Sequence, residues 1–193
     1  MDNISKNKYA SIPNIITSFR VLGTFGLLFV EPFTFPFFIL YTFCGVSDVL
    51  DGWVARTTGS ITEFGSRFDS ISDLLFYAVM LIRIFPVMWE ILPKTIWLGV
   101  AAIIVLRIIS YTLAALKYRR FAALHTYMNK MTGFFLFCVP YFLTSVFGVV
   151  YCKCVCAVSA ISTLEEFLIH CYAKKYTTEN KTLWKTLQHQ KTA

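Results

Sequence analysis

Long apolar runs alternate with short polar stretches along the whole 193-residue chain. A helix needs about 20 mostly apolar residues to cross the ~30 Å hydrocarbon core of a bilayer, and six runs approach that length. We therefore predict an all-α integral membrane protein with six transmembrane helices. Pro13 suits the first turn of the first helix, and the polar start of the chain is expected to form an interfacial helix segment. The predicted spans are residues 11–30, 35–56, 65–85, 94–116, 132–150 and 155–172.

The composition supports this fold class and excludes an ordinary soluble domain. Hydrophobic residues make up 56% of the chain, and the mean hydropathy is +0.61. Such values are typical of integral membrane proteins. No polar segment is long enough to fold separately, so we expect residues 1–193 to form a single membrane domain that ends in a polar tail from about residue 173 to residue 193.

The net charge of +7 is explained by membrane topology rather than by nucleic acid binding, because the positive residues gather at span ends and in short loops. One side of the membrane would hold only Lys94 and Lys153, together with Glu31 and Glu90. Positive loops mark the cytosol, so a multi-pass protein of the cell (inner) membrane with both termini cytosolic is predicted. The cytosolic side would hold Lys6, Lys8, Arg56, Arg67, Lys117, Arg119, Arg120, Lys130, Lys174, Lys175, Lys181, Lys185 and Lys191.

Four aspartates interrupt the apolar pattern between Ser47 and Asp73. Asp48 and Asp51 are three residues apart, and Asp69 and Asp73 are four apart, so each pair would share one face of a helix. The polar stretch 56–60 between the two pairs would let the helices run antiparallel. The sequence thus predicts a cluster of four carboxylates near one membrane surface.

Such a cluster requires a cation, since unpaired carboxylates in an apolar protein repel one another strongly. Ligands that are all oxygen select hard ions such as Mg²⁺, Mn²⁺ or Ca²⁺. Gly52 and Ala55 continue the face of Asp48 and leave room for a bulky group. The simpler alternative is a set of helix-end aspartates solvated at the membrane surface, but that alternative does not require this spacing together with small residues and an arginine.

The spacing in this segment resembles the signature of the CDP-alcohol phosphatidyltransferase family, which includes bacterial phospholipid synthases such as phosphatidylglycerophosphate synthase. The pattern is Asp, two residues, Asp-Gly, two residues, Ala-Arg, eight residues, Gly, three residues, Asp, three residues, Asp. It covers 26 residues and matches at every defined position. These positions are Asp48, Asp51, Gly52, Ala55, Arg56, Gly65, Asp69 and Asp73.

The resemblance implies an enzyme that transfers a phosphatidyl group from CDP-diacylglycerol to a small polar alcohol and releases CMP. It implies that Asp48, Asp51, Asp69 and Asp73 hold two ions of Mg²⁺ or Mn²⁺, and that Asp73 is also the catalytic base for the acceptor hydroxyl. A homodimer is implied as well. The Pro-Asn-x-x-Thr-x-x-Arg stretch that ends at Arg20 resembles the opening of many members. The residues implied to bind CDP are Asn14, Thr17, Gly52, Ala55, Arg56 and Gly65.

The acceptor alcohol is less well defined. Glycerol-phosphate enzymes of the family often carry Asp-Pro-x-x-Asp-Lys, whereas this chain has Ser70 and Leu74 at the Pro and Lys positions. Glycerol-3-phosphate is our first choice, and serine, inositol and inositol phosphate are the alternatives. An anionic acceptor would be held by basic residues, although a structural ion pair or a solvated positive-inside cluster would also explain them. The candidates are Arg107, Arg119, Arg120 and Lys130.

Two other functional classes were weighed against the transferase. A small divalent-cation transporter would need polar residues that continue across the membrane, yet the outer halves of the second and third spans are almost wholly apolar. A prenyl-diphosphate enzyme would resemble Asp-Asp-x-x-Asp, and the chain has no adjacent Asp-Asp pair. Cys152, Cys154 and Cys156 fan around one helix and are expected to be buried small residues rather than metal ligands or disulfide partners.

Overall fold

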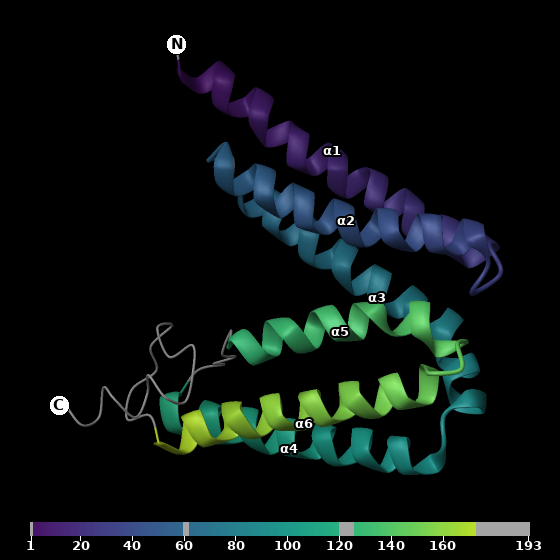
Figure 1. Ribbon diagram of the computed structural model, residues 1–193. Coiled ribbons are helices and arrows are strands. Elements are labelled where there is room, and N and C mark those ends of the chain that lie inside the picture. The colour runs from purple at the N-terminus through teal and green to yellow at the C-terminus, as the bar shows by residue number, and fades with distance from the viewer. Residues whose placement is uncertain (1, 60–61, 120–125, 173–193) are drawn as a thin grey trace. The chain divides into compact units, whose positions relative to one another are not determined.

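The computed structural model is entirely helical over the part of the chain that it describes, which is residues 2–59, 62–119 and 126–172, with side chains from residue 12 onward. This agrees with the predicted fold class. The α1–α2 and α5–α6 connections are short, and the two helices of each pair form an antiparallel hairpin (Figure 1). The helices are α1 (Asp2–Phe29), α2 (Phe35–Thr57), α3 (Glu63–Ile91), α4 (Lys94–Tyr118), α5 (Tyr127–Leu143) and α6 (Gly148–Tyr172).

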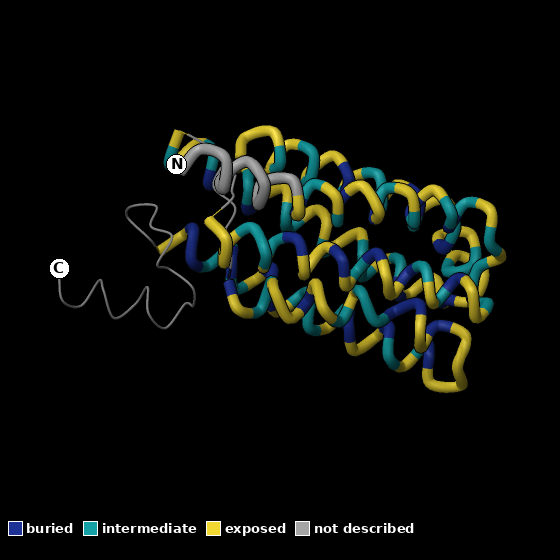
Figure 2. The backbone as a smooth tube through the Cα atoms, turned by 90° about the horizontal axis from the view of Figure 1, so that it is seen from above, coloured by how far each residue is buried: buried dark blue, intermediate teal, exposed yellow. Residues whose placement is uncertain are grey.

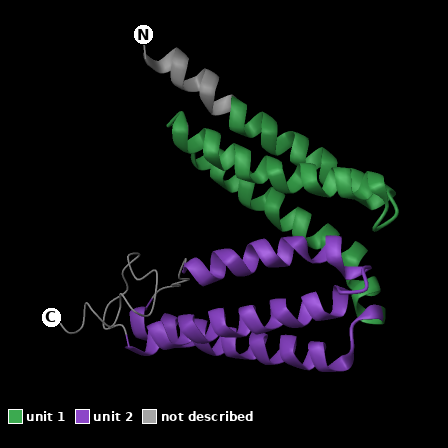
Figure 3. Cartoon of the chain, viewed as in Figure 1, with its two compact units in different colours: residues 1–90 green, residues 91–193 purple. Residues whose placement is uncertain are grey.

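The chain divides into two compact units, which are coloured separately in Figure 3. The first unit comprises residues 1–90 and contains α1, α2 and nearly all of α3. The second unit comprises residues 91–193 and contains α4, α5 and α6. The predicted aspartate cluster therefore belongs to the first unit, and all four candidate acceptor residues fall within the residue range of the second.

In the first unit, α1 packs lengthwise against α2. Glycines on α1 make this close approach possible. A Cβ atom added at Gly23 would lie 3.0 Å from the Sγ atom of Cys44, and one at Gly26 would lie 3.3 Å from a methyl group of Leu40. Leu27 and Cys44 are buried in this contact. Gly23 and Gly26 thus allow α1 and α2 to pack closely in the unit that contains the aspartates.

In the second unit, α6 packs against both α4 and α5. The α5–α6 turn occupies residues 144–147, and α6 begins at Gly148. A Cβ atom at Gly148 would lie 2.3 Å from the carbonyl oxygen of Leu143, so only glycine fits there. The predicted fifth span, residues 132–150, was wrong at its C-terminal end, because it ran through this turn into α6. Val146 and Phe147 make the turn apolar, so the hydropathy pattern does not reveal it.

Within the described residues, five helices are long and apolar enough to cross a membrane: α1 from Ile12, α2, α3, α4 and α6. Exposed residues recur along these helices, as expected for side chains that face lipid (Figure 2). The 17 residues of α5 extend about 26 Å, which is less than the ~30 Å hydrocarbon core. The prediction of six spans is thus confirmed for five. The first helix begins at Asp2, so Pro13 lies inside it rather than in its first turn.

Candidate active site

The four aspartates project from facing stretches of two helices that are joined by a short turn. Asp48 and Asp51 lie on α2, about two turns before its end, and Asp69 and Asp73 lie on the first turns of α3. Oxygen atoms of Asp48, Asp51 and Asp69 all lie within 4.8 Å of one another. The helix spacing read from the sequence therefore brings the carboxylates together, as expected.

Arg20 lies at the centre of this cluster and is paired with all four aspartates. Its Nη1 atom contacts Asp48 and lies 3.0 Å from Asp73. Its Nη2 atom lies 2.5 Å from Asp69 and 3.6 Å from Asp51. The Arg20 side chain is only 1% exposed, so its charge is balanced entirely by these neighbours.

The sequence does not predict this role for Arg20, which stands at the end of the Pro-Asn-x-x-Thr-x-x-Arg stretch. Its signal was nonetheless present, because a single arginine inside an apolar span needs a carboxylate partner or a wet cavity. Ser72 adds a further contact, since the Nε atom of Arg20 donates a 3.0 Å hydrogen bond to its hydroxyl oxygen. Ser72 is itself buried between the two aspartates of α3.

Asp51 differs from the other three aspartates in its burial. Its side chain is 4% exposed, whereas those of Asp48, Asp69 and Asp73 are 48%, 42% and 38% exposed. The hydroxyl group of Thr17 donates a 2.8 Å hydrogen bond to Oδ2 of Asp51. This bond satisfies a carboxylate oxygen that would otherwise be costly to bury. Three of the four carboxylates thus remain accessible to a ligand.

A pocket of about 180 Å³ opens beside Asp51 and Asp69. It lies between α1, the end of α2 and the start of α3, and small side chains form much of its wall. Pro13, Thr62 and Ser66 complete the lining. All six residues that the sequence assigned to CDP binding line this one pocket, namely Asn14, Thr17, Gly52, Ala55, Arg56 and Gly65.

Gly65 and Gly52 determine the shape of this pocket in different ways. A Cβ atom at Gly65 would lie 2.9 Å from the hydroxyl oxygen of Thr62 and 3.0 Å from Oδ1 of Asn14, so a side chain there would collide with the pocket wall. At Gly52, a Cβ atom would meet the guanidinium group of Arg56 at 3.5 Å, which is an ordinary contact. Arg56 therefore folds back over Gly52, where it places a positive charge at the pocket.

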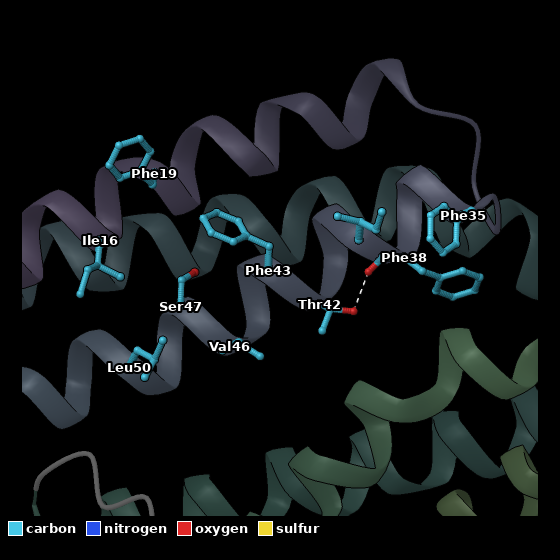
Figure 4. Close-up of a pocket in the computed structure, with 10 residues that line it drawn as sticks. Ile16, Phe19, Phe35, Phe38, Thr42, Phe43, Val46, Ser47 and Leu50 are labelled. Atoms are coloured by element: carbon cyan, nitrogen blue, oxygen red, sulfur yellow. Dashed lines mark hydrogen bonds between the residues drawn. The ribbon is translucent and has the colours of Figure 1, made fainter.

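A second, apolar groove of about 680 Å³ runs along α1 and α2 (Figure 4). The groove is lined by Ile16 and Phe19 of α1 and by residues from successive turns of α2 between Phe35 and Leu50. Its polar lining groups are the hydroxyls of Thr42 and Ser47, which donate to the carbonyl groups of Phe38 and Cys44 on their own helix. The groove is therefore suited to hydrocarbon, and Ser47 in its lining immediately precedes Asp48 in the chain.

The second unit contains a polar network around Arg107, in the middle of α4. The Nη2 atom of Arg107 donates to Oδ1 of Asn129 at 3.0 Å and to the hydroxyl group of Thr163 at 3.3 Å. Asn129 in turn donates to the buried carboxylate of Glu166 at 3.0 Å. Asn129 thus links Arg107 to the structural carboxylate of Glu166. A structural partner of this kind is one of the two explanations that the sequence left open for Arg107, the other being an acceptor phosphate.

Arg119 and Lys130, the other candidate acceptor residues within the described part of the chain, do not join this network. Arg119 caps the C-terminal end of α4, about 18 Å along the helix from Arg107, and is exposed. Lys130 lies in the first turns of α5 and is also exposed. Arg120 lies outside the described residues. Of the three candidates that the structure describes, Arg107 is thus the one held by side-chain hydrogen bonds.

The cysteines of α6 fall into different environments. Cys152 is buried, Cys156 is partly buried and Cys154 is exposed. Successive positions two apart on a helix point in nearly opposite directions, which explains this alternation. The expectation of burial therefore holds for Cys152 and is wrong for Cys154.

Comparison with known proteins agrees with the geometry of the site. A protein-family model described as CDP-alcohol phosphatidyltransferase matches residues 10–165, which include the aspartate cluster, the pocket and parts of both units. The chain belongs to the CDP-alcohol phosphatidyltransferase family. Membership in this family favours a transferase over the cation transporter considered above.

Curated members of the family resemble this chain at similar levels but differ in acceptor. A CDP-diacylglycerol–glycerol-3-phosphate 3-phosphatidyltransferase of Pseudomonas fluorescens is 34% identical over 97 residues, which are 46% of this chain and 50% of the relative. A CDP-diacylglycerol–serine O-phosphatidyltransferase of Methanocaldococcus jannaschii is 35% identical over 78 residues, 39% of this chain and 32% of the relative. The chain thus spans half or less of the length of these relatives.

A plant relative extends the range of acceptors. CDP-diacylglycerol–inositol 3-phosphatidyltransferase 1 of Arabidopsis thaliana is 34% identical over 77 residues, which are 38% of this chain and 33% of the relative. No solved structure matches this chain. Identity alone therefore does not separate glycerol-3-phosphate, serine and inositol as acceptors.

Proposed function

We propose that this protein transfers a phosphatidyl group from CDP-diacylglycerol to the hydroxyl group of a small polar alcohol and releases CMP, as a step in phospholipid biosynthesis. The observation that carries this proposal is the position of the pocket. Six residues implied to bind CDP line one space that also reaches Asp51 and Asp69. A nucleotide in this pocket would have its diphosphate beside the carboxylates.

The residues of the cluster fit a divalent metal site. Their donor set is entirely carboxylate oxygen, which suits Mg²⁺ or Mn²⁺, and three of the carboxylates already lie within 4.8 Å of one another. We propose that Asp48, Asp51, Asp69 and Asp73 hold two such ions. When bound, the ions would neutralise the diphosphate and stabilise the departing CMP.

Asp73 is proposed as the base. An alcohol hydroxyl holds its proton tightly at neutral pH, so a nearby carboxylate must accept that proton as the oxygen attacks. The acceptor oxygen forms a bond to the phosphorus that carries diacylglycerol. The bond from that phosphorus to the bridging oxygen breaks, and CMP leaves with the electron pair. Arg56, which lines the pocket, would pair with a phosphate.

Glycerol-3-phosphate is the proposed acceptor, with serine, inositol and inositol phosphate as the alternatives. Arg107, Arg119, Arg120 and Lys130 are proposed as its binding residues. We also propose that the acyl chains of the donor lie in the groove between Phe19 and Leu50, because that groove is apolar and its lining includes Ser47, which precedes Asp48 in the chain. The nucleotide and the acyl chains would then occupy two spaces that are both lined by α1 and α2.

The proposal includes the setting of the reaction. Both units would act as one membrane domain, since the family match covers parts of each. The active site would face the cytosol, and the protein would form a homodimer. Sealed inside-out vesicles should then release CMP when the acceptor is added outside, whereas right-side-out vesicles should not. The mass of the detergent-solubilised protein would test the homodimer.

The decisive experiment measures CMP release by the purified protein with CDP-diacylglycerol and Mg²⁺ or Mn²⁺. Glycerol-3-phosphate, serine, inositol and inositol phosphate are supplied separately. We expect release with one acceptor and its loss in Asp73→Asn. Glu63→Gln is the matched control, because Glu63 is an exposed carboxylate on the same helix that pairs with Arg67 instead of Arg20.

Each outcome has a definite meaning. Release that depends on one acceptor and on Asp73 identifies both the reaction and the acceptor. Release that persists in Asp73→Asn would remove Asp73 from the role of base. If the protein neither releases CMP nor binds CDP with metal, the transferase proposal is wrong.

A further inference from the structure

Among the residues that the structure describes, Arg20 is the one positive side chain paired with the four aspartates, and its position is held from several directions. Its guanidinium group contacts all four carboxylates and the hydroxyl group of Ser72. Its backbone carbonyl group accepts a 2.8 Å hydrogen bond from Thr24 and a contact from the Cys44 thiol at 3.7 Å. This part of α1 is therefore anchored to α2 at the level of the cluster.

The contacts of Arg20 leave part of the cluster free for metal ions. Arg20 uses Oδ1 of Asp48, Asp69 and Asp73. At Asp51, the same oxygen, Oδ2, faces Arg20 and accepts the hydrogen bond from Thr17. Each carboxylate thus directs one oxygen at these two residues of α1, and its second oxygen takes no part in the ion pairs with Arg20. Arg20 and a metal can therefore share the carboxylates.

The charge of Arg20 changes the electrostatic balance of a loaded site. Four carboxylates and one guanidinium group carry a net charge of −3. Two divalent ions would raise this to +1 in a mostly apolar protein, where like charges repel strongly. A diphosphate with about two negative charges would return the balance to about −1. Without Arg20, the four carboxylates alone would neutralise two divalent ions.

We propose that Arg20 is a resident counter-cation that weakens divalent-metal binding in the empty site and so makes full metal loading depend on the donor diphosphate. This inference rests on the proposed function, since it concerns the same aspartates. It assigns Arg20 the role of a positioning residue that acts through the carboxylates. The consequence is an order of binding in which metal and donor enter together.

The test measures Mn²⁺ binding to the full-length purified chain with and without CDP as the soluble diphosphate probe. In the unaltered protein, CDP should tighten Mn²⁺ binding by about tenfold or more, and Mn²⁺ should tighten CDP binding by the same factor. In Arg20→Gln, Mn²⁺ should bind about tenfold more tightly without CDP, and the effect of CDP should shrink. These readouts do not require catalysis.

Two further variants separate charge from shape. Arg20→Lys keeps the charge but loses the planar fork, so it should keep most of the coupling between CDP and Mn²⁺. Arg67→Gln is the control, because Arg67 is 76% exposed on the same helix as Asp69 and Asp73 and pairs with Glu63. It should leave both affinities unchanged. Circular dichroism and gel filtration establish that each variant is folded.

The inference is overturned if Arg20→Gln binds Mn²⁺ no more tightly than the unaltered protein, or if its coupling to CDP is unchanged. If Arg20→Gln does not fold, the unaltered protein and Arg20→Lys decide the matter. A coupling below about twofold in the unaltered protein, or its loss in Arg20→Lys, contradicts the inference. CMP release that depends on Asp73 would leave the proposed function intact in each of these cases.

Discussion

Thr17 donates a 2.8 Å hydrogen bond to Asp51, and both residues line the pocket beside the carboxylate cluster. This bond joins α1 to the one aspartate of the four that is buried. It therefore connects the proposed nucleotide pocket with the proposed metal site.

Replacing Thr17 with valine removes this donor while it keeps the side-chain shape. The buried oxygen of Asp51 then loses its hydrogen-bond donor Thr17, which costs about 1–3 kcal/mol of stabilisation at this site. We expect kcat/KM for CDP-diacylglycerol to fall by about tenfold or more in Thr17→Val. Thr17→Ser keeps the hydroxyl group and should retain most of the activity. Equal activity in the two variants would show that the hydrogen bond has no part in the reaction.

Gly65→Ala tests the shape of the pocket. The new methyl group would lie within about 3 Å of Thr62 and Asn14, so these side chains must move into the space proposed for the nucleotide. We expect KM for CDP-diacylglycerol to rise by about fivefold or more, with a smaller change in kcat. Gly99→Ala is the matched control, because nothing lies within 4 Å of a Cβ atom there. An unchanged KM in Gly65→Ala would place the nucleotide elsewhere.

Metal dependence is tested by removing ions and ligands separately. Chelation with EDTA should abolish CMP release, and Mg²⁺ or Mn²⁺ should restore it. Asp69→Asn should lower kcat by about 100-fold or more, because it removes a charged ligand beside the pocket. CMP release that survives EDTA would contradict the metal site and leave Arg20 as the cation of the cluster.

The Arg107 network should stabilise the second unit. In Asn129→Leu, the guanidinium group of Arg107 and the carboxylate of Glu166 lose the amide that links them, which costs about 3 kcal/mol. We expect the melting temperature to fall by roughly 5–10 °C. Lys153→Gln, at an exposed position on α6, should leave it unchanged. A fall of less than about 2 °C in Asn129→Leu would show that this network adds little stability.

Much of the candidate site could be predicted from the sequence because its residues are close in the chain. Asp48 and Asp51 share a helix face through their spacing, as do Asp69 and Asp73, and a short turn brings the two faces together. The membrane-spanning helices could be predicted equally directly, from apolar runs that are long enough to cross a bilayer. The α5–α6 turn could not, because hydropathy does not mark a turn whose residues are apolar.

What the sequence by itself determined is thus the helical membrane fold, the family signature and the two pairs of aspartates. The tertiary structure alone decided that Arg20 lies among aspartates 28 to 53 residues away, and that Arg107 pairs with Asn129 and Thr163. The physical reason is that local spacing sets which face of its own helix a side chain occupies. The packing and rotation of neighbouring helices set which distant side chain that face meets, and a single apolar span is compatible with several such arrangements.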